Sequence, residues 1–340
     1  MILVTGGTGL LGAHLLHKIV SEGKSVRAIY RNEAKLQHVL KIFSYHSSQA
    51  QILFDKIEWV KCDVLDKYTL SMQFADIDEV YHCAAHVSFN PREKEEILSV
   101  NINGTENMVD LSLENRINKF CFVSSIASLG KKDKGEVDEE CYLQTLKGKS
   151  DYAVSKFRAE MEVWRGIEEG LNAIIVNPSI ILGAGDWVSD SSLFFSMVNN
   201  GLKFYTKGEN GFVDVLDVVN AMILLMDSDI VNERFILNGE NISYQKLFGD
   251  IAKNINKPTP SLSLSEWLGM LACRIEKVRA TLMRSSPRIT KDSMQSGFSY
   301  AAYSNEKIKH KIGFTFSPIE STIKRIAINF VNTVKLKNRT

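Results

Sequence analysis

Two side chains capable of acid–base chemistry, Tyr152 and Lys156, stand four residues apart in the sequence. On a helix this spacing places both side chains on one face, with about 5–6 Å between their Cβ atoms. A tyrosine with a pKa near ~10 is a poor acid or base at neutral pH until a neighbouring positive charge favours the phenolate, and Lys156 can supply that charge. The hydroxyl of Ser125 can donate a hydrogen bond to an oxygen on which charge develops. Together the three residues predict redox chemistry between a carbonyl and an alcohol.

A glycine-rich segment near the start of the chain predicts a site for a dinucleotide cofactor. Gly6, Gly9 and Gly12 recur every three residues between an apolar run and a helical pattern. Glycines let the backbone turn sharply and let a pyrophosphate approach a helix N-terminus, whose free N–H groups favour an anion. Plain strand–helix connections can also be rich in glycine, but the position directly after a predicted strand favours the cofactor site. The residues expected to border the cofactor here are Gly6, Thr8, Gly9, Leu10, Leu11 and Gly12.

The residues after the second apolar run bear on which dinucleotide binds. An acidic side chain there would hydrogen-bond the ribose 2′-hydroxyl of NAD, whereas an arginine accommodates the 2′-phosphate of NADP. Arg31 follows this run and Lys35 comes one turn later, so we expect NADP(H). NAD(H) is the alternative, in which Glu33 binds the ribose and Arg31 is an ordinary exposed arginine. After the third run, Asp63 could cap a helix or hydrogen-bond the adenine amino group, and Val64 beside it is expected to contact the cofactor.

The elements that must position these residues follow from the pattern of apolar residues. Short apolar runs rich in β-branched residues alternate with longer helical patterns. That alternation predicts an α/β fold of the Rossmann type, with a doubly wound parallel sheet and helices on both of its faces. The expected strands are residues 2–5, 25–30, 57–61, 79–82, 119–124, 172–177 and 234–237. The expected helices are residues 10–21, 67–74, 103–114 and 152–169.

The alternation stops in two later segments, the second of which is broken up by prolines. Insertions near the carboxyl ends of the later strands would cover the cleft in which open parallel sheets bind ligands. We therefore assign these segments to a smaller, C-terminal substrate lobe, in which Trp267, Leu268 and Met270 could line an apolar pocket or, as we favour, bury their helix. The predicted division is a cofactor-binding domain of residues 1–178 plus 212–240, a substrate-binding lobe of residues 179–211 plus 241–330, and a solvated tail of residues 331–340.

The overall composition narrows the classes of partner. With 41 basic against 40 acidic side chains the net charge is +1, so no global field draws the chain to nucleic acid or to an anionic membrane, and a small molecule is the expected partner. The five cysteines lie far apart without paired spacing, which argues against a metal site or disulfides and favours a reducing cytoplasm. No apolar run reaches the ~18 residues of a membrane span. We expect no signal peptide, because the first apolar residues lead directly into the glycines.

With these motifs in view, the chain resembles an extended short-chain dehydrogenase/reductase of the NAD-dependent epimerase/dehydratase group. Besides the glycines, Tyr152 and Lys156, the matching motifs lie at residues 82–85, 100–107, 122–125, 176–183 and 212–218. The resemblance implies that Ser125 donates to the oxyanion, that Tyr152 is the acid/base, and that Lys156 is its electrostatic partner and binds the nicotinamide ribose. It also implies that two copies could pair as a homodimer through residues 103–114 and 152–169.

Residues near the cofactor and the substrate follow from the same resemblance. Ala84 and Ala85 would border the cofactor, and Pro178 would lie near the nicotinamide amide. His86 follows the two alanines directly and could face the substrate, together with Ser125 and Tyr152.

The family hosts several reactions, so the function rests on particular residues. Arg31 and the late motifs are similar to the corresponding features of dihydroflavonol reductases. We therefore predict an NADPH-dependent reductase that transfers hydride to a ketone or aldehyde carbonyl of a small, moderately apolar substrate. The alternative is a nucleotide-sugar epimerase with tightly bound NAD, which would use the same Tyr152. Family dehydratases carry an acidic pair after the active hydroxyl, where this chain has Ile126 and Ala127, which counts against dehydration.

Overall fold

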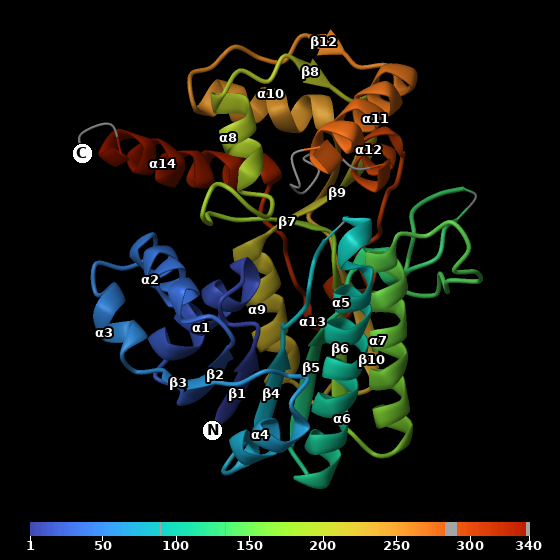
Figure 1. The fold of residues 1–340 in the computed structure, drawn as a ribbon. Helices are drawn as coiled ribbons and strands as arrows, with labels where there is room; N and C mark the ends of the chain where they lie inside the picture. Colours follow the sequence, from blue (N-terminus) through green and yellow to red (C-terminus); the bar gives the residue numbers. More distant parts are fainter. Residues whose placement is uncertain (89, 133, 283–290, 338–340) are drawn as a thin grey trace.

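Seven strands in the described part of the chain form one parallel sheet (Figure 1). The computed structural model describes residues 1–88, 90–132, 134–282 and 291–337. Across the sheet the strands follow the order β10-β6-β5-β4-β1-β2-β3. They are β1 (Ile2–Thr5), β2 (Val26–Tyr30), β3 (Glu58–Lys61), β4 (Glu79–His82), β5 (Lys119–Val123), β6 (Ala173–Pro178) and β10 (Glu233–Leu237). The predicted doubly wound parallel sheet is confirmed, and each strand lies within one residue of its predicted bounds.

Helices cover both faces of the sheet (Figure 1). One face is covered by α1 (Leu10–Ser21), α2 (Leu36–Ser44), α3 (Ala50–Phe54) and α9 (Val215–Met226), and the other by α4 (Lys67–Ser71), α6 (Gly104–Glu114) and α7 (Asp151–Glu168), with α5 (Lys94–Leu98) packed against α7. Successive side chains of a strand point to opposite faces. In β1, Val4 packs with the first group of helices and Leu3 with the second, and both are fully buried. A strand covered on both faces must be apolar throughout, which explains the unbroken apolar runs in the sequence.

The order of the strands reverses at β1. From β1 the chain first adds β2 and β3 on one side and then returns to add β4, β5 and β6 on the other. Open α/β sheets bind ligands in the crevice outside the carboxyl ends of their strands at such a reversal. The loop after β1 and the loop after β4 therefore mark the expected ligand site.

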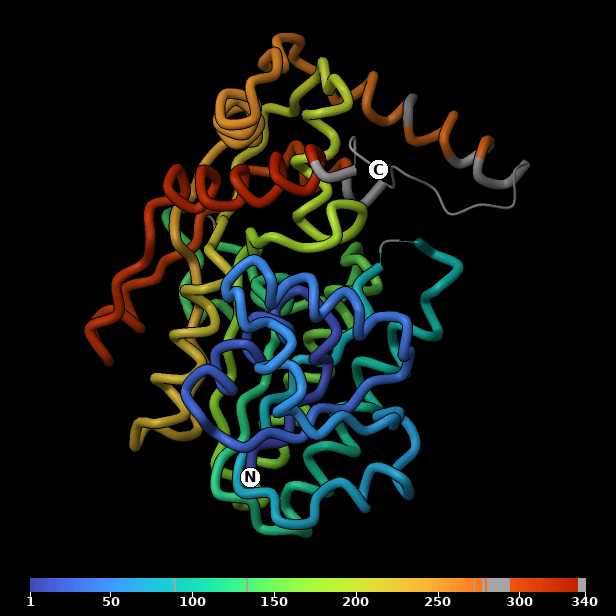
Figure 2. Tube along the Cα trace, turned by 90° about the vertical axis from the view of Figure 1, so that its left-hand side faces the viewer, coloured from blue at the N-terminus to red at the C-terminus, as the bar shows by residue number. Residues whose placement is uncertain are grey.

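A second group of elements stands beyond the carboxyl ends of the strands (Figures 1 and 2). Its described residues form the three-stranded sheet β11-β9-β7, the two-stranded sheet β12-β8 and five helices. Its core joins large side chains that include Trp187, Phe195, Phe248, Ile326 and Phe330. The elements are β7 (Ile180–Leu182), α8 (Leu193–Asn199), β8 (Phe204–Tyr205), β9 (Glu209–Asp214), β11 (Glu240–Ser243), α10 (Tyr244–Asn254), β12 (Leu262–Ser263), α11 (Glu266–Leu282), α12 (Lys291–Phe298) and α14 (Ile319–Lys337), while α13 (Glu306–Ile312) packs against β10.

The end of the chain differs from its prediction as a solvated tail from residue 331. Helix α14 continues to Lys337. Val331 and Val334 pack, partly buried, on the core of this second group, so the helical pattern of apolar residues continues past Phe330. Among the described residues, no helix has both the length and the apolar character needed to cross a bilayer.

Candidate active site

The glycine segment forms a tight turn between β1 and α1. Gly6 has a φ of 69°, a left-handed conformation that favours glycine. A Cβ at Gly6 would lie 2.5 Å from the backbone of Cys83 and Ala84, and a Cβ at Gly12 would overlap the carbonyl oxygen of Gly6. The loop after β1 therefore lies directly against the loop after β4, at the reversal of the sheet.

The N-terminus of α1 opens from this turn without a side-chain cap. Gly9 is the N-cap residue and adopts an extended conformation, and its own N–H donates to the Gly6 carbonyl at 3.0 Å. The first N–H groups of a helix have no partner within the helix, and the helix dipole adds positive potential there. No side chain caps the N-terminus of this 12-residue helix, and the turn before it is built of glycines. A pyrophosphate therefore fits against the free N–H groups.

Arg31 lies directly after β2, where its guanidinium is 3.8 Å from the Asp63 carboxylate. Both side chains are exposed to solvent, at 48% and 40%. Asp63 also accepts a hydrogen bond at 3.0 Å from the Leu65 backbone N–H. The N-cap of α4 is Asp66, so the interpretation of Asp63 as a helix cap is wrong. Its contact with adenine stays a prediction, as do the phosphate contacts of Arg31 and of the exposed Lys35.

Ser125 and Tyr152 come together across the carboxyl end of β5. Ser125 is the N-cap of a short 3-10 turn, and its hydroxyl accepts a hydrogen bond at 3.1 Å from the Ala127 N–H. Tyr152 lies in the first turn of α7, which Ser150 caps through the Ala153 N–H. Burial raises the pKa of Tyr152, and a side-chain hydrogen bond with Ser125 opposes that rise. The phenol is therefore protonated at neutral pH and is already paired with the predicted oxyanion donor.

Lys156 lies one turn further along α7 and is 2% exposed. Its ammonium donates a hydrogen bond at 2.6 Å to the Val123 carbonyl, at the end of β5, and lies 4.5 Å from the centre of the Phe122 ring. Burial lowers the pKa of Lys156 to about 8, and the charge of Glu160 works in the opposite direction. Of the predicted catalytic residues, Tyr152 and Lys156 thus lie on one helix, and Ser125 lies just after the strand end that Lys156 contacts. Lys156 remains largely cationic at neutral pH.

A buried cluster around Glu160, which the sequence analysis missed, lies beneath this site. The Glu160 carboxylate accepts hydrogen bonds from Ser124 Oγ at 2.6 Å, Ser128 Oγ at 2.8 Å and Asn177 Nδ2 at 2.9 Å. It also pairs with Arg234 at 3.0 Å. The sequence feature that could have indicated Glu160 is its spacing of four residues from Lys156, because that spacing places both side chains on the same face of α7.

A second buried chain of hydrogen bonds, also missed, links β1 to α7. His82 contacts Thr5 Oγ1 at 2.6 Å and Thr105 Oγ1 at 3.0 Å. Burial lowers the pKa of His82 to about 3, so the ring is neutral. Thr105 donates to the Asn101 carbonyl, so it must accept from His82 Nε2–H, which leaves Nδ1 to accept from Thr5.

The chain continues through Asn101, which lies in a π-helical turn, Ser99–Asn103. Its amide donates to Ser155 Oγ at 2.8 Å, and Ser155 donates to the Tyr152 carbonyl at 2.8 Å. The strand that carries the glycine turn is thereby connected to the first turn of α7. The sequence favours Asn101 as a helix-start or scaffold residue rather than a chemical one, and these contacts fit that interpretation without having been predicted.

The remaining predicted residues lie around the same edge of the sheet. The Ala84 N–H donates to Thr5 Oγ1 at 3.2 Å, and Pro178 is buried at the end of β6. Val64 is buried, with its side chain against the start of α6. The His86 ring lies 2.9 Å from the Glu93 carboxylate, so it is held by an acid in this structure, and its contact with substrate stays a prediction.

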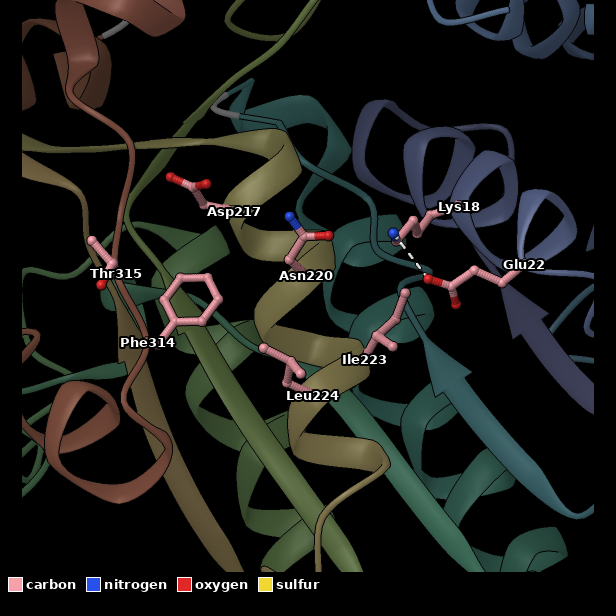
Figure 3. A pocket seen from close by; sticks show the side chains of 8 residues that line it. All are labelled: Lys18, Glu22, Asp217, Asn220, Ile223, Leu224, Phe314 and Thr315. Atoms are coloured by element: carbon pink, nitrogen blue, oxygen red, sulfur yellow. Dashed lines mark ion pairs between the residues drawn. The ribbon is translucent and has the colours of Figure 1, made fainter.

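A surface hollow between α1 and α9 lies away from these residues (Figure 3). Its described lining includes Lys18, Glu22, Asp217, Leu224 and Phe314, and no predicted site residue. Lys18 is more than two turns along α1 from the glycine turn, which corresponds to roughly 12 Å along the helix. The hollow is therefore separate from the candidate active site.

Curated relatives match most of the chain. A putative dihydroflavonol 4-reductase of Synechocystis is 26% identical over 94% of this chain and 91% of its own length. Sterol demethylase protein B of Methylococcus capsulatus is 26% identical over 86% of this chain and 87% of its own. Cinnamoyl-CoA reductase 1 of Petunia hybrida is 24% identical over 76% of this chain and 78% of its own.

Solved structures share the fold over nearly all of the chain. The crystal structure of gox2253 is 25% identical, with a TM-score of 0.79 and coverage of 98% of both chains. The UDP-glucose 4-epimerase of Thermotoga maritima is 20% identical, with a TM-score of 0.76 and coverage of 98% of this chain and 99% of its own. The second likeness concerns the fold alone.

The family model described as "NAD dependent epimerase/dehydratase family" matches residues 2–237, which include the glycine turn, Ser125, Tyr152 and Lys156. The chain therefore belongs to the NAD-dependent epimerase/dehydratase family of extended short-chain dehydrogenases/reductases, enzymes that use NAD(P).

Proposed function

We propose that the protein is an NADPH-dependent reductase of a ketone or aldehyde carbonyl on a small, moderately apolar substrate. The observation that carries the proposal is the pairing of the Tyr152 phenol with the Ser125 hydroxyl, one turn from the buried Lys156 ammonium. The names of the reductase relatives support the direction of the reaction. The uncapped N-terminus of α1 and the glycine turn fit the cofactor, which when bound would supply a hydride to the carbonyl carbon.

The residues of the chain would act on the carbonyl oxygen. Ser125 donates a hydrogen bond to that oxygen as negative charge develops on it. Tyr152 gives its proton to the same oxygen, so that the carbonyl gains a hydride at carbon and a proton at oxygen and becomes an alcohol. The phenolate left on Tyr152 is stabilised by the ammonium of Lys156 until solvent returns the proton. The raised pKa of Tyr152 keeps the phenol protonated and ready to donate.

Arg31 is the residue proposed to select the phosphorylated cofactor. It lies at the end of β2 and is exposed, and Lys35 adds a second positive charge nearby. Asp63 at 3.8 Å neutralises part of the charge of Arg31, and a 2′-phosphate would compete for the same guanidinium. The contact is charge-assisted, so NADPH should bind better than NADH.

The fate of a labelled hydride tests the reaction. NADPH carrying deuterium at C4 would be mixed with the protein and a panel of aromatic and aliphatic ketones, aldehydes and nucleotide sugars. A reductase consumes NADPH in step with product and leaves deuterium on the product carbon. Interconversion of sugar isomers without net use of added cofactor would instead establish the epimerase and overturn the proposal.

A further inference from the structure

Glu160 contacts the main-chain turn that carries Ser125 on both of its sides. The side chain is 1% exposed and lies on α7, one turn beyond Lys156. Ser124, directly before Ser125, donates to its carboxylate at 2.6 Å, and Ser128, at the end of the 3-10 turn, lies 2.8 Å from the same oxygen. An ionised carboxylate only accepts hydrogen bonds, so one group can hold several donors at once.

The carbonyl of Ser125 is tied to the same carboxylate through Asn177. The Asn177 amide nitrogen carries two protons and lies 2.9 Å from Glu160 and 3.2 Å from the Ser125 carbonyl, so it can donate to both. Ser128 Oγ lies 2.8 Å from that carbonyl as well. A misplacement of about 1 Å in a reacting group can cost ~10²-fold in rate. These contacts fix the main chain from which the Ser125 hydroxyl projects.

Glu160 also supplies the negative charge that faces Lys156. Burial lowers the pKa of Lys156, and the charge of Glu160 opposes this effect. Two other titratable groups interact with the ammonium, His82 at the end of β4 and Cys83 directly after it. Burial lowers the pKa of His82 to about 3 and raises that of Cys83 to about 12, so both are uncharged at neutral pH. Within the described residues, Glu160 is therefore the anion that favours the cationic form of Lys156.

We propose that Glu160 is a positioning residue of the proposed reduction, which acts through Ser125 and Lys156 rather than on the substrate. Its hydrogen bonds hold the donor to the reacting oxygen in place, and its charge favours the ammonium that must stabilise the Tyr152 phenolate. Arg234, at 3.0 Å, supplies the opposite charge that a buried carboxylate requires. The effect on rate rests on the proposed function, whereas the effect on Lys156 requires no substrate.

An NMR titration of Lys156 tests the electrostatic part without substrate. In protein labelled at the lysine Cε atoms, the signal that Lys156→Met removes should titrate near pH 8. Glu160→Gln/Arg234→Met removes both buried charges together and leaves neither alone. In this double variant the Lys156 signal should titrate roughly 1 pH unit lower, because an opposite charge is lost. Glu162→Gln, at a partly exposed position on the same helix, is the matched control and should leave the titration unchanged.

The rate of carbonyl reduction tests the consequence for catalysis. A midpoint near pH ~7 leaves about a tenth of Lys156 cationic at pH ~8, against about half in the unaltered chain. The double variant should therefore lower kcat about 5-fold at pH ~8 and hardly at all at pH ~6. A loosened fold would lower kcat alike at both pH values, and thermal melting reports the fold separately.

Ser128→Ala isolates the route through Ser125. The substitution removes a hydroxyl that contacts both the Glu160 carboxylate and the Ser125 carbonyl. It should lower kcat at every pH, while the KM for NADPH and the titration of Lys156 stay unchanged.

Three results would overturn the proposal. The first is an unchanged Lys156 titration in the double variant. The second is a loss of kcat in the double variant that is equal at pH ~6 and pH ~8, against the titration argued above. The third is full kcat in Ser128→Ala, which would remove the route through Ser125. Failure of the unaltered chain to reduce any carbonyl would instead overturn the proposed function, and the NMR titration would still decide whether Glu160 sets the charge of Lys156.

Discussion

The Glu160 carboxylate and the Arg234 guanidinium meet at 3.0 Å beneath the Ser124–Ser125 turn, and their side chains are 1% and 7% exposed. Glu160 also accepts from Ser124 Oγ, while Arg234 donates to the Glu139 carbonyl at 2.8 Å. A buried ion pair gains little over an apolar pair, but leaving one member alone is costly. The pair therefore ties the turn that carries Ser125 to α7 and β10.

Replacing Glu160 with Gln should destabilise the protein by about 3–5 kcal/mol, because it leaves the buried Arg234 charge uncompensated. Urea unfolding measures the loss. Glu162→Gln is the matched control on the same helix, since Glu162 is partly exposed and pairs with Arg165 at 2.9 Å. That control should cost less than about 1 kcal/mol. Equal losses in the two variants would show that the buried pair does not hold the turn.

Tyr152→Phe removes the proposed proton donor and keeps the ring. Turnover of a carbonyl substrate should fall by at least ~10², while cofactor affinity and melting temperature persist. Tyr142→Phe is a suitable control, because Tyr142 is 63% exposed and its ring packs under Arg234. Lys156→Met should reduce both the rate and cofactor binding. If Tyr152→Phe kept more than about a tenth of the activity, another group would have to be the acid.

Arg31→Asp should weaken NADPH by roughly 2–4 kcal/mol and spare NADH, because it replaces a charge-assisted contact with repulsion. Fluorescence titration of both cofactors gives the two affinities. Arg158→Asp, at an exposed position on α7, controls for the change in net charge. A parallel loss for both cofactors, or a preference of the unaltered protein for NADH, contradicts the assignment of NADPH.

Most strands of the seven-stranded sheet were predictable because they are apolar runs covered on both faces, whereas the edge strand β3 is partly exposed. Helix α9 could not be predicted in this way, because buried side chains lie on several of its sides and little polar face is left to give a helical period. The buried side chains include Val218, Val219, Met222 and Leu225. Trp267 and Leu268 on α11 were expected to bury their helix but are 66% and 43% exposed, since an apolar stripe has the same spacing whether it faces the fold or solvent.

The positions of the candidate site residues were predictable from local motifs, but their partners were not. Ser155 lies 54 residues from Asn101, and Arg234 lies 74 residues from Glu160. Such contacts depend on how strands and helices are assembled, and a local pattern in the sequence carries no information about them. The Asp63 carboxylate illustrates the same limit, because its pairing with Arg31 requires β2 and β3 to be neighbours.

Three histidines meet where α1 packs against α2. The ring of His46 lies 5.0 Å from that of His14 and 4.9 Å from that of His17, between ring centres. Burial lowers the pKa of His14 to about 3 and that of His46 to about 4, with a smaller effect from the positive Arg325. Within the described chain, the Nε2 atoms of all three rings have no hydrogen-bond partner. The folded protein therefore holds these rings neutral.

Acid should destabilise the protein through this cluster. The unfolded chain binds protons at these histidines near pH ~6.5, whereas the folded chain does not, so the stabilisation is complete above that pH and is lost as the pH falls. Each histidine ring that stays neutral in the folded protein makes the free energy of unfolding fall with decreasing pH. The slope is at most about 1.4 kcal/mol per pH unit, over the range between the unfolded and folded pKa of that ring. Urea unfolding at several pH values between neutrality and pH ~4.5 measures the slope. His14→Leu should flatten it by about one proton, even if the variant is less stable. An unchanged slope in His14→Leu would mean that His14 takes up its proton equally in the folded and unfolded chains.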